Sequence, residues 1–354
     1  MKKRRENMKS IKKTLALLVI ATLIIGVVTG CGRADASAVS KTNAATEHPS
    51  EGKNVRVSYW AYNIQGTLFQ AAQEFGIWDE VIGKLGDDVN IELIPFENGP
   101  VANEAITAGE LDIELSLGDQ PFITGNANGV DTSILATTMK QEKSYITVVA
   151  ADSDINSPAD LKGKNIGVGI GTFSHKSFIG ILDDNGIDVS EVSFTNLGDA
   201  AYGEALTAIG SGELDAYFGP WSSLAQALEE GTVRQIGDGT GHPLTTYFVA
   251  KNEFINDNPE ITKALVETLY KTVDYINNNK EEAAAFFSKQ LDWDEEIVSQ
   301  LLDKVEVVVD LTEEDIASIT ETQQFLLDQE ILDEEVEDLV EKHTNSTFIN
   351  EVKK

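Results

Sequence analysis

The sequence predicts an α/β protein with two lobes and additional helices near its C-terminal end. From residue 55 onward, short runs rich in β-branched residues alternate with runs of helical period, which is the pattern of a sheet covered by helices. About 300 residues follow the N-terminal region, which is large for a single hydrophobic core. A short segment also recurs about 100 residues later in the chain, as expected for two similar lobes.

The recurring segment joins an expected helix to an expected strand. Residues 104–112 read EAITAGELD, while residues 204–208 read EALTA and residues 212–215 read GELD. In both copies a glycine loop follows the strand. Two copies are too few for a solenoid, so we interpret them as corresponding parts of two lobes. A chance match is the alternative, because GELD is an ordinary turn between a helix and a strand.

Hydrophobic period and turn residues predict the individual elements. Strands are expected at residues 55–60, 90–96, 111–117, 133–139, 145–151, 165–170 and 192–196. Helices are expected at residues 66–85, 101–108, 173–185, 258–278, 281–289, 294–304, 312–327 and 333–343. Ser157-Pro158 and Asn258-Pro259 are typical helix starts, and residues 312–315 resemble a capping box. We expect the strongly acidic C-terminal helices to pack against one lobe.

The first 30 residues predict export. Residues 1–13 carry seven Lys or Arg and one Glu, and an apolar run follows that is short for a permanent membrane span. Residues 28–31, VTGC, resemble a bacterial lipobox, which implies that Cys31 is lipidated and becomes the N-terminus. We therefore expect a lipoprotein signal peptide over 1–30, a lipid anchor at Cys31 and a flexible tether over 31–52. An ordinary signal peptide with a chance cysteine is the alternative.

The charge of the chain limits its partners. The sequence has 27 basic and 59 acidic residues, a formal net charge of −32, and removal of the signal peptide brings the charge to −38. Nucleic acid is therefore excluded as a partner, because phosphate binding needs clustered Lys and Arg. An anionic ligand is compatible with this charge, because backbone N–H groups alone can hold an anion.

Two junctions between a strand and a helix predict an anion site. Glycine lets a ligand approach the backbone, and a helix N-terminus favours negative charge. The expected ligand-binding residues are Gly118, Asp119, Gln120 and Pro121 at the first junction and Gly171, Thr172, Phe173, Ser174 and His175 at the second. Trp60, Tyr62 and Trp221 are expected to cover the apolar part of a ligand, with core packing as the alternative. His175 is interpreted equally well as a ligand contact or as a helix residue satisfied by its surroundings.

Signals for catalysis and metal binding are missing from the sequence. It contains no GxSxG, HExxH or kinase signature, and its four histidines lack the spacing of metal ligands. Cys31 is the only cysteine, which argues against a catalytic thiol or a disulfide. We therefore expect ligand binding without turnover, with no cofactor and no metal.

An ordered set of motifs resembles the substrate-binding proteins of nitrate, taurine and aliphatic sulfonate importers, the NMT1/THI5-like family. The resemblance covers residues 55 to about 348. Its motifs are Tyr59-Trp60, residues 96–100 (FENGP), 108–113 (AGELDI), 118–121 (GDQP), 157–168 (SPADLKGKNIGV), 171–175 (GTFSH), 212–216 (GELDA) and 258–260 (NPE).

The resemblance implies a periplasmic-binding-protein type II fold that closes over its ligand. Lobe one would span residues 53–151 and 245–350, and lobe two residues 152–244. The protein would be an ABC importer's lipoprotein on the extracytoplasmic face of the cell membrane, with permease subunits as partners. Its ligand would be a small organic anion, first an aliphatic sulfonate or a taurine-like molecule. Trp221 stands one place later than in the family and no acidic residue follows it, which leaves the contacts of the ligand tail open.

Alternative functions remain at this point. The same fold binds nitrate, an organic carboxylate or a thiamine pyrimidine precursor. A pyrimidine synthase-like enzyme is less favoured, because that family carries a cysteine cluster that this chain lacks. An extracellular sensor would need a membrane span and a signalling domain, and neither is recognised in the sequence.

Overall fold

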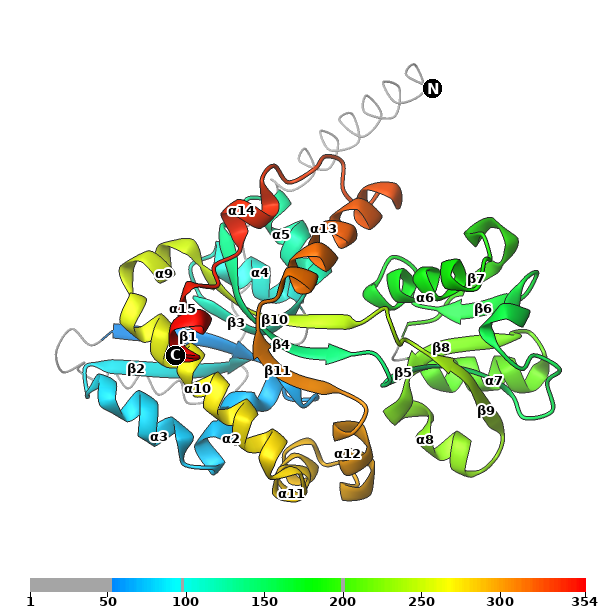
Figure 1. Cartoon of the computed structure of the whole chain (residues 1–354), viewed down its shortest axis with the longest axis horizontal. Coiled ribbons are helices and arrows are strands. Elements are labelled where there is room, and N and C mark those ends of the chain that lie inside the picture. The colour runs from blue at the N-terminus through cyan, green and yellow to red at the C-terminus, as the bar shows by residue number, and fades with distance from the viewer. Residues whose placement is uncertain (1–52, 97–98, 199–200) are drawn as a thin grey trace, which may run out of the picture. The chain divides into compact units, whose positions relative to one another are not determined.

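The computed structural model describes residues 53–96, 99–198 and 201–354 (Figure 1). The predicted signal peptide, the anchor Cys31 and the tether over 31–52 lie outside the described residues. Within the described part, strands form one six-stranded and one five-stranded sheet, and helices lie around both. This arrangement confirms the predicted α/β fold with two lobes. We call the part built on the six-stranded sheet the first lobe and the other part the second lobe.

The first lobe is built on strands from both ends of the described chain. They are β1 (Lys53–Tyr59), β2 (Val89–Pro95), β3 (Ile113–Gly118), β4 (Thr132–Gln141), β10 (Leu244–Lys251) and β11 (Glu306–Asp310), in the order β11-β4-β10-β3-β1-β2. β1 runs parallel to β2 and β3, whereas β10 runs antiparallel to both β3 and β4. The sheet is therefore mixed, because β10 returns from the second lobe and inserts between two earlier strands.

The second lobe contains the strands between β4 and β10. They are β5 (Tyr145–Ala150), β6 (Asn165–Val168), β7 (Ser193–Asn196), β8 (Ala216–Pro220) and β9 (Val233–Asp238), in the order β7-β6-β8-β5-β9. The expected boundary at residue 151 differs from this pairing, because β5 pairs antiparallel with β8 and β9. The chain passes between the sheets at residues 142–144 and 239–243.

The helices agree with the predicted pattern in place more than in length. They are α2 (Leu68–Glu74), α3 (Ile77–Val81), α4 (Gly99–Thr107), α5 (Asp119–Ala127), α6 (Phe173–Asp184), α7 (Tyr202–Ser211), α8 (Trp221–Glu229), α9 (Asn252–Asp257), α10 (Pro259–Asn278), α11 (Lys280–Leu291), α12 (Glu295–Leu302), α13 (Glu313–Asp328), α14 (Leu339–His343) and α15 (Thr347–Val352). The helix expected over 66–85 is divided at Gly76, whose φ of 73° lies in the left-handed region. The capping box is confirmed, because Thr312 and Asp315 each accept a hydrogen bond from the other's backbone N–H.

The C-terminal helices pack mainly against the first lobe, as the sequence predicted, although α12 also contacts α8 of the second lobe (Figure 1). α10 packs on α2 and α3, α13 on α5, and α14 and α15 on β4. Alternation along β10 explains how the sheet holds helices on both faces. Phe248 packs edge to face on Phe69 of α2, whereas Tyr247 and Val249 join an apolar cluster with Ile319 of α13.

Candidate functional site

A cleft of about 580 Å³ lies between the two lobes. It is reached by the ends of β1, β3 and β8 and by the first turns of α6 and α8, the edge at which open α/β sheets bind ligands. Its walls carry hydroxyl, amide and aromatic side chains, and among residues 53–96, 99–198 and 201–354 no acidic, basic or histidine side chain lines it. An ionic ligand would therefore meet dipoles and hydroxyl groups in this cleft rather than an opposite charge.

Five of the residues singled out from the sequence line this cleft: Trp60, Tyr62, Gly118, Pro121 and Phe173. Trp60 is 4% exposed, and its indole N–H donates to the backbone oxygen of Ser116 at 3.2 Å. Because that bond uses the indole's only donor, Trp60 presents an apolar surface to the cleft. Phe173 lies edge to face against Tyr145, with ring centres 5.9 Å apart.

The polar side chains of the first junction turn away from the cleft. Asp119 is 5% exposed. Its carboxylate accepts hydrogen bonds from Thr322 of α13 at 2.6 Å and from the backbone N–H of Gln120 at 2.8 Å. The side-chain nitrogen of Gln120 is buried and has no partner among the described residues. Neither residue lines the cleft.

The second junction is held together mainly by its own hydrogen bonds. Gly171 has a φ of 78°, and its N–H donates to Nδ1 of His175 at 3.2 Å. Thr172 donates to the backbone oxygen of Gly169 at 2.6 Å and shares a hydrogen bond with the hydroxyl of Ser174. His175, with Phe194 and Phe325 around its ring, has a pKa lowered by burial. None of these four junction residues, Gly171, Thr172, Ser174 or His175, lines the cleft.

Trp221 lies in the core, and its neighbours face the cleft. The Trp221 side chain is 7% exposed, belongs to the large apolar cluster, and has the ammonium of Lys304 4.9 Å from its ring centre. Ser222 and Ser223, in the first turn of α8, line the cleft instead. Sequence reasoning missed both serines, although two serines just after Pro220, at the end of a strand, were a signal that could have identified them.

Other cleft residues were also missed. Ser116, Thr246 and Gln65 line the first-lobe side, and Trp293 enters from the connection between α11 and α12. The sequence does not indicate that Trp293 lines a cleft, because the helices on either side of it are rich in acidic residues, as solvent-facing helices are. Ser116 has a φ of 63°, an uncommon value for a residue other than glycine, and the sequence gives no sign of it.

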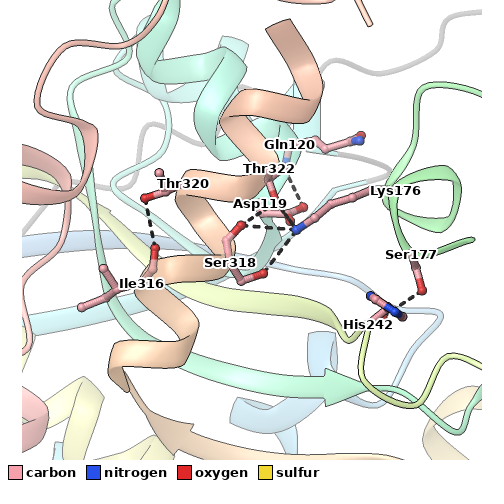
Figure 2. Close-up of polar contacts among 9 residues, drawn as sticks. All are labelled: Asp119, Gln120, Lys176, Ser177, His242, Ile316, Ser318, Thr320 and Thr322. Atoms are coloured by element: carbon pink, nitrogen blue, oxygen red, sulfur yellow. Dashed lines mark hydrogen bonds and ion pairs between the residues drawn. The ribbon is translucent and has the colours of Figure 1, made fainter. Parts of the chain in front are cut away.

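Lys176 joins the two lobes beside the cleft (Figure 2). Its ammonium, carried by α6, donates to Thr322 Oγ1 at 2.6 Å and to the backbone and side-chain oxygens of Ser318 at 3.3 Å. It also lies 3.9 Å from the Asp119 carboxylate. We call Lys176, Asp119, Ser318 and Thr322 the interlobe bridge. The charge of Lys176 is thus directed at α5 and α13 of the first lobe.

Two further properties concern the described residues as a whole. Nowhere in residues 53–96, 99–198 and 201–354 do three or more His, Cys, Asp or Glu side chains gather closely enough to hold a metal ion. The same residues contain no helix with the length and apolar character of a membrane span.

The two sheets, the two connections between them and the intervening cleft define a two-lobed binding protein of the periplasmic-binding-protein type II fold. Solved structures show this fold. The periplasmic aliphatic sulphonate binding protein SsuA of Escherichia coli superposes with a TM-score of 0.72 at 21% identity, covering 84% of this chain and 99% of SsuA. The alkanesulfonate-binding protein SsuA from Xanthomonas axonopodis pv. citri, bound to MOPS, gives a TM-score of 0.63 at 20% identity, covering 81% of this chain and 96% of that protein.

The family follows from the sequence match. Residues 86–283 match the NMT1/THI5-like family, and the chain belongs to that family. A Bacillus subtilis (strain 168) protein, named as a candidate aliphatic sulfonates-binding protein, is 24% identical over 337 residues, which are 94% of this chain and 95% of the relative. The fold also occurs in the desulfurization enzyme DszB: a DszB mutant in complex with biphenyl-2-sulfinic acid has a TM-score of 0.65 at 18% identity, covering 84% of this chain and 98% of DszB.

Proposed function

We propose that this protein is the substrate-binding lipoprotein of an ABC importer, and that it captures a small organic anion between its lobes outside the cytoplasm. The observation that carries the proposal is the cleft between two lobes of the binding-protein fold, whose described lining residues are hydroxyl-bearing, amide, aromatic and aliphatic and carry no charge. Membership of the NMT1/THI5-like family supports it, as do similar proteins that are named for binding sulfonates.

The ligand's negative charge would be held without an opposite charge. The first turns of α6 and α8 reach the cleft at Phe173 and at Ser222 and Ser223, and helix N-termini supply free N–H groups and a favourable dipole. The serine hydroxyls add further donors. We propose that Gly171, Thr172, Ser174 and His175 shape the start of α6, and that Asp119 and Gln120 shape the start of α5.

An aliphatic sulfonate is the ligand class that we propose first. Its charge is spread over three oxygens, so several neutral donors can share it. The cleft has aromatic walls that are suited to an organic group, contributed by Trp60, Tyr62, Tyr145, Phe173 and Trp293. Nitrate has no organic group that could pack against them. An organic carboxylate and a thiamine pyrimidine precursor stay as alternatives within the same fold.

Binding without turnover is part of the proposal. The structural similarity to DszB means that the fold alone does not separate a binding protein from an enzyme. The relatives named for sulfonate binding favour a binding protein. The chain's only cysteine, Cys31, belongs to the proposed anchor, so no other cysteine is present to act as a nucleophile.

The proposed division into lobes follows the sheets. Lobe one would comprise residues 53 to about 142 and about 244 to 350, and lobe two the residues between, with 142–144 and 239–243 as the hinge connections. Lipidation of Cys31 would tether this two-lobed body to the extracytoplasmic face of the cell membrane, where the importer's permease subunits lie.

Calorimetry with matched anions tests the ligand class. We expect butane-1-sulfonate to bind with a Kd of about 1 μM or below, and nitrate and pentanoate to bind at least tenfold more weakly. Pentanoate has the same chain length with a carboxylate head, and nitrate lacks the chain. Tighter binding of nitrate or pentanoate than of the sulfonate would contradict the proposed ligand class.

A further inference from the structure

Three hydroxyl groups from three neighbouring strands form a hydrogen-bonded chain at the floor of the cleft. Ser116 of β3 donates to the backbone oxygen of Gln65 at 2.7 Å. The Ser116 hydroxyl lies 2.9 Å from Thr138 Oγ1 of β4, and Thr138 Oγ1 lies 2.9 Å from Thr246 Oγ1 of β10. We call these three residues the hydroxyl chain. Ser116 and Thr246 line the cleft, and Thr138 is fully buried.

The hydrogen bonds of the hydroxyl chain can run in only one direction. Each hydroxyl carries one hydrogen, and the backbone oxygen of Gln65 can only accept. Ser116 therefore donates its hydrogen to the backbone oxygen of Gln65 and must accept a hydrogen bond from Thr138. Thr138 then has no hydrogen left for Thr246, so Thr246 donates to Thr138. Thr246 thus lines the cleft with its hydrogen already used, and no described residue donates a hydrogen bond to its remaining lone pairs.

The backbone keeps this direction in place. Ser116 has a φ of 63°, and its backbone oxygen accepts the indole N–H of Trp60 at 3.2 Å. Thr246 pairs with Gly118 across the strands β10 and β3, which holds it beside the first junction. Rotating the Ser116 hydroxyl would leave the Gln65 bond unmade in a site where Ser116 is only 5% exposed.

We propose that Thr246 accepts a hydrogen bond from the ligand, and that the protein therefore selects anions that also carry an O–H or N–H donor. This inference rests on the proposed function, since it adds a second recognition element to the same cleft. A ligand group that can only accept would face the lone pair of Thr246 and be disfavoured. An alkyl group would leave that acceptor desolvated and unpaired.

Calorimetry with two matched series of probes tests the proposal. The first series is the ω-hydroxyalkane-1-sulfonates of two to six carbons, and the second is the alkane-1-sulfonates in which a methyl group replaces each hydroxyl. At the chain length that reaches Thr246, we expect the hydroxyl compound to bind about three- to tenfold more tightly than its methyl counterpart. Equal or weaker binding of every hydroxyl compound overturns the inference and leaves the proposed function intact. If no sulfonate of either series binds, the proposed ligand class is wrong and the inference falls with it.

Variants then assign the preference to Thr246. Thr246→Val should bring the ratio of the two Kd values close to one, and Thr246→Ser should keep the wild-type ratio. Thr137→Val is the matched control, because Thr137 is a buried neighbour on β4 whose hydroxyl has no partner among the described residues. A preference that survives in Thr246→Val contradicts the assignment.

Thr138→Val tests the direction of the hydrogens. Without Thr138 as acceptor, Thr246 is free to donate into the cleft. We expect an ω-methoxyalkane-1-sulfonate, whose ether oxygen only accepts, to gain about three- to tenfold in affinity relative to its all-carbon counterpart when wild type is replaced by this variant. No gain in this ratio contradicts the fixed direction of the hydroxyl chain.

Discussion

Glu114 lies fully buried on β3, and neither of its carboxyl oxygens has a hydrogen-bond partner among the described residues. Burial raises its pKa well above the usual value, so that the side chain is held in its uncharged form. The folded state therefore binds a proton that the unfolded chain releases above about pH 4.3. The free energy of unfolding should accordingly fall as the pH rises from that value towards the raised pKa.

Replacing Glu114 with Gln should remove this pH-dependent loss while keeping the shape of the side chain. We expect Glu114→Gln to have a higher free energy of unfolding than wild type at pH 8, by about 1–3 kcal/mol, and a smaller advantage at pH 5. Urea denaturation at both pH values measures the difference. Glu92→Gln, at an exposed position of β2, is the matched control. An equal advantage at the two pH values would contradict the assignment to ionisation.

His175 contributes a dependence of the opposite sign. Burial lowers its pKa, so below about pH 6.5 the unfolded chain binds a proton that the folded protein resists. Stability from this residue is complete above that pH and is lost as the pH falls towards the lowered pKa. His175→Asn keeps an acceptor for the Gly171 N–H and does not titrate. We expect its free energy of unfolding to fall less than that of wild type between pH 7.5 and 5.5, by at most about 1.4 kcal/mol per pH unit. Urea denaturation at both pH values measures this change. If the free energy of unfolding falls equally in the variant and in wild type, the dependence does not come from His175.

Among the structural elements, α6 and α13 form a contact between the lobes through the interlobe bridge (Figure 2). Removing the ammonium of Lys176 leaves Asp119 with its Thr322 hydrogen bond but without a neighbouring positive charge. Because the bridge joins segments that separate when the lobes open, it should favour the closed arrangement.

We expect Lys176→Met to shift the ligand-free protein towards a more open arrangement, which small-angle X-ray scattering detects as a larger radius of gyration. Ligand affinity should fall about two- to tenfold, because closure then costs about 0.4–1.4 kcal/mol more. Lys289→Met, at an exposed position of α11, makes the same change in charge without touching the bridge. If the two variants have the same radius of gyration and affinity, the bridge does not control closure.

The elements that were predicted well are those specified by local sequence. β1, β2 and α10 follow from period and from the Asn258-Pro259 start, and the structure places them within a few residues of the expectation. The place of β10 between β3 and β4 was not predictable in this way, because its partners lie more than 100 residues earlier in the chain. β5 was expected in lobe one, but it pairs with β8 and β9, which follow it by about 70 to 90 residues, and its own sequence does not specify these partners.

Residues at the cleft follow a similar division. Trp60 was identifiable because it follows a strand that ends at the binding edge. Trp221 has the same kind of sequence context, yet it turns into the core and leaves Ser222 and Ser223 at the cleft. Which side chain faces the core depends on the residue at which α8 begins and on the packing of α12 against α8. The sequence alone does not give either.

For the whole molecule, the proposed anchor at Cys31 would decide where the ligand is captured. The chain is strongly acidic, so its body has no electrostatic attraction to an anionic membrane surface. We expect Cys31→Ala to move the protein from the membrane fraction to the soluble extracytoplasmic fraction, as seen by cell fractionation and immunoblotting. Thr42→Ala, a change within the proposed tether, should leave it in the membrane fraction. If the Cys31 variant stays in the membrane fraction until detergent is added, another segment holds the protein at the membrane.

The central claim is that the cleft binds a small organic anion and returns it unchanged. The most direct measurement is mass spectrometry of the ligand released by denaturing the purified protein, once immediately and once after prolonged incubation. We predict a stoichiometric organic sulfonate that carries a hydroxyl or amino group, with the same mass in both samples. A ligand without an anionic head, or a second mass that grows during incubation, would contradict the account.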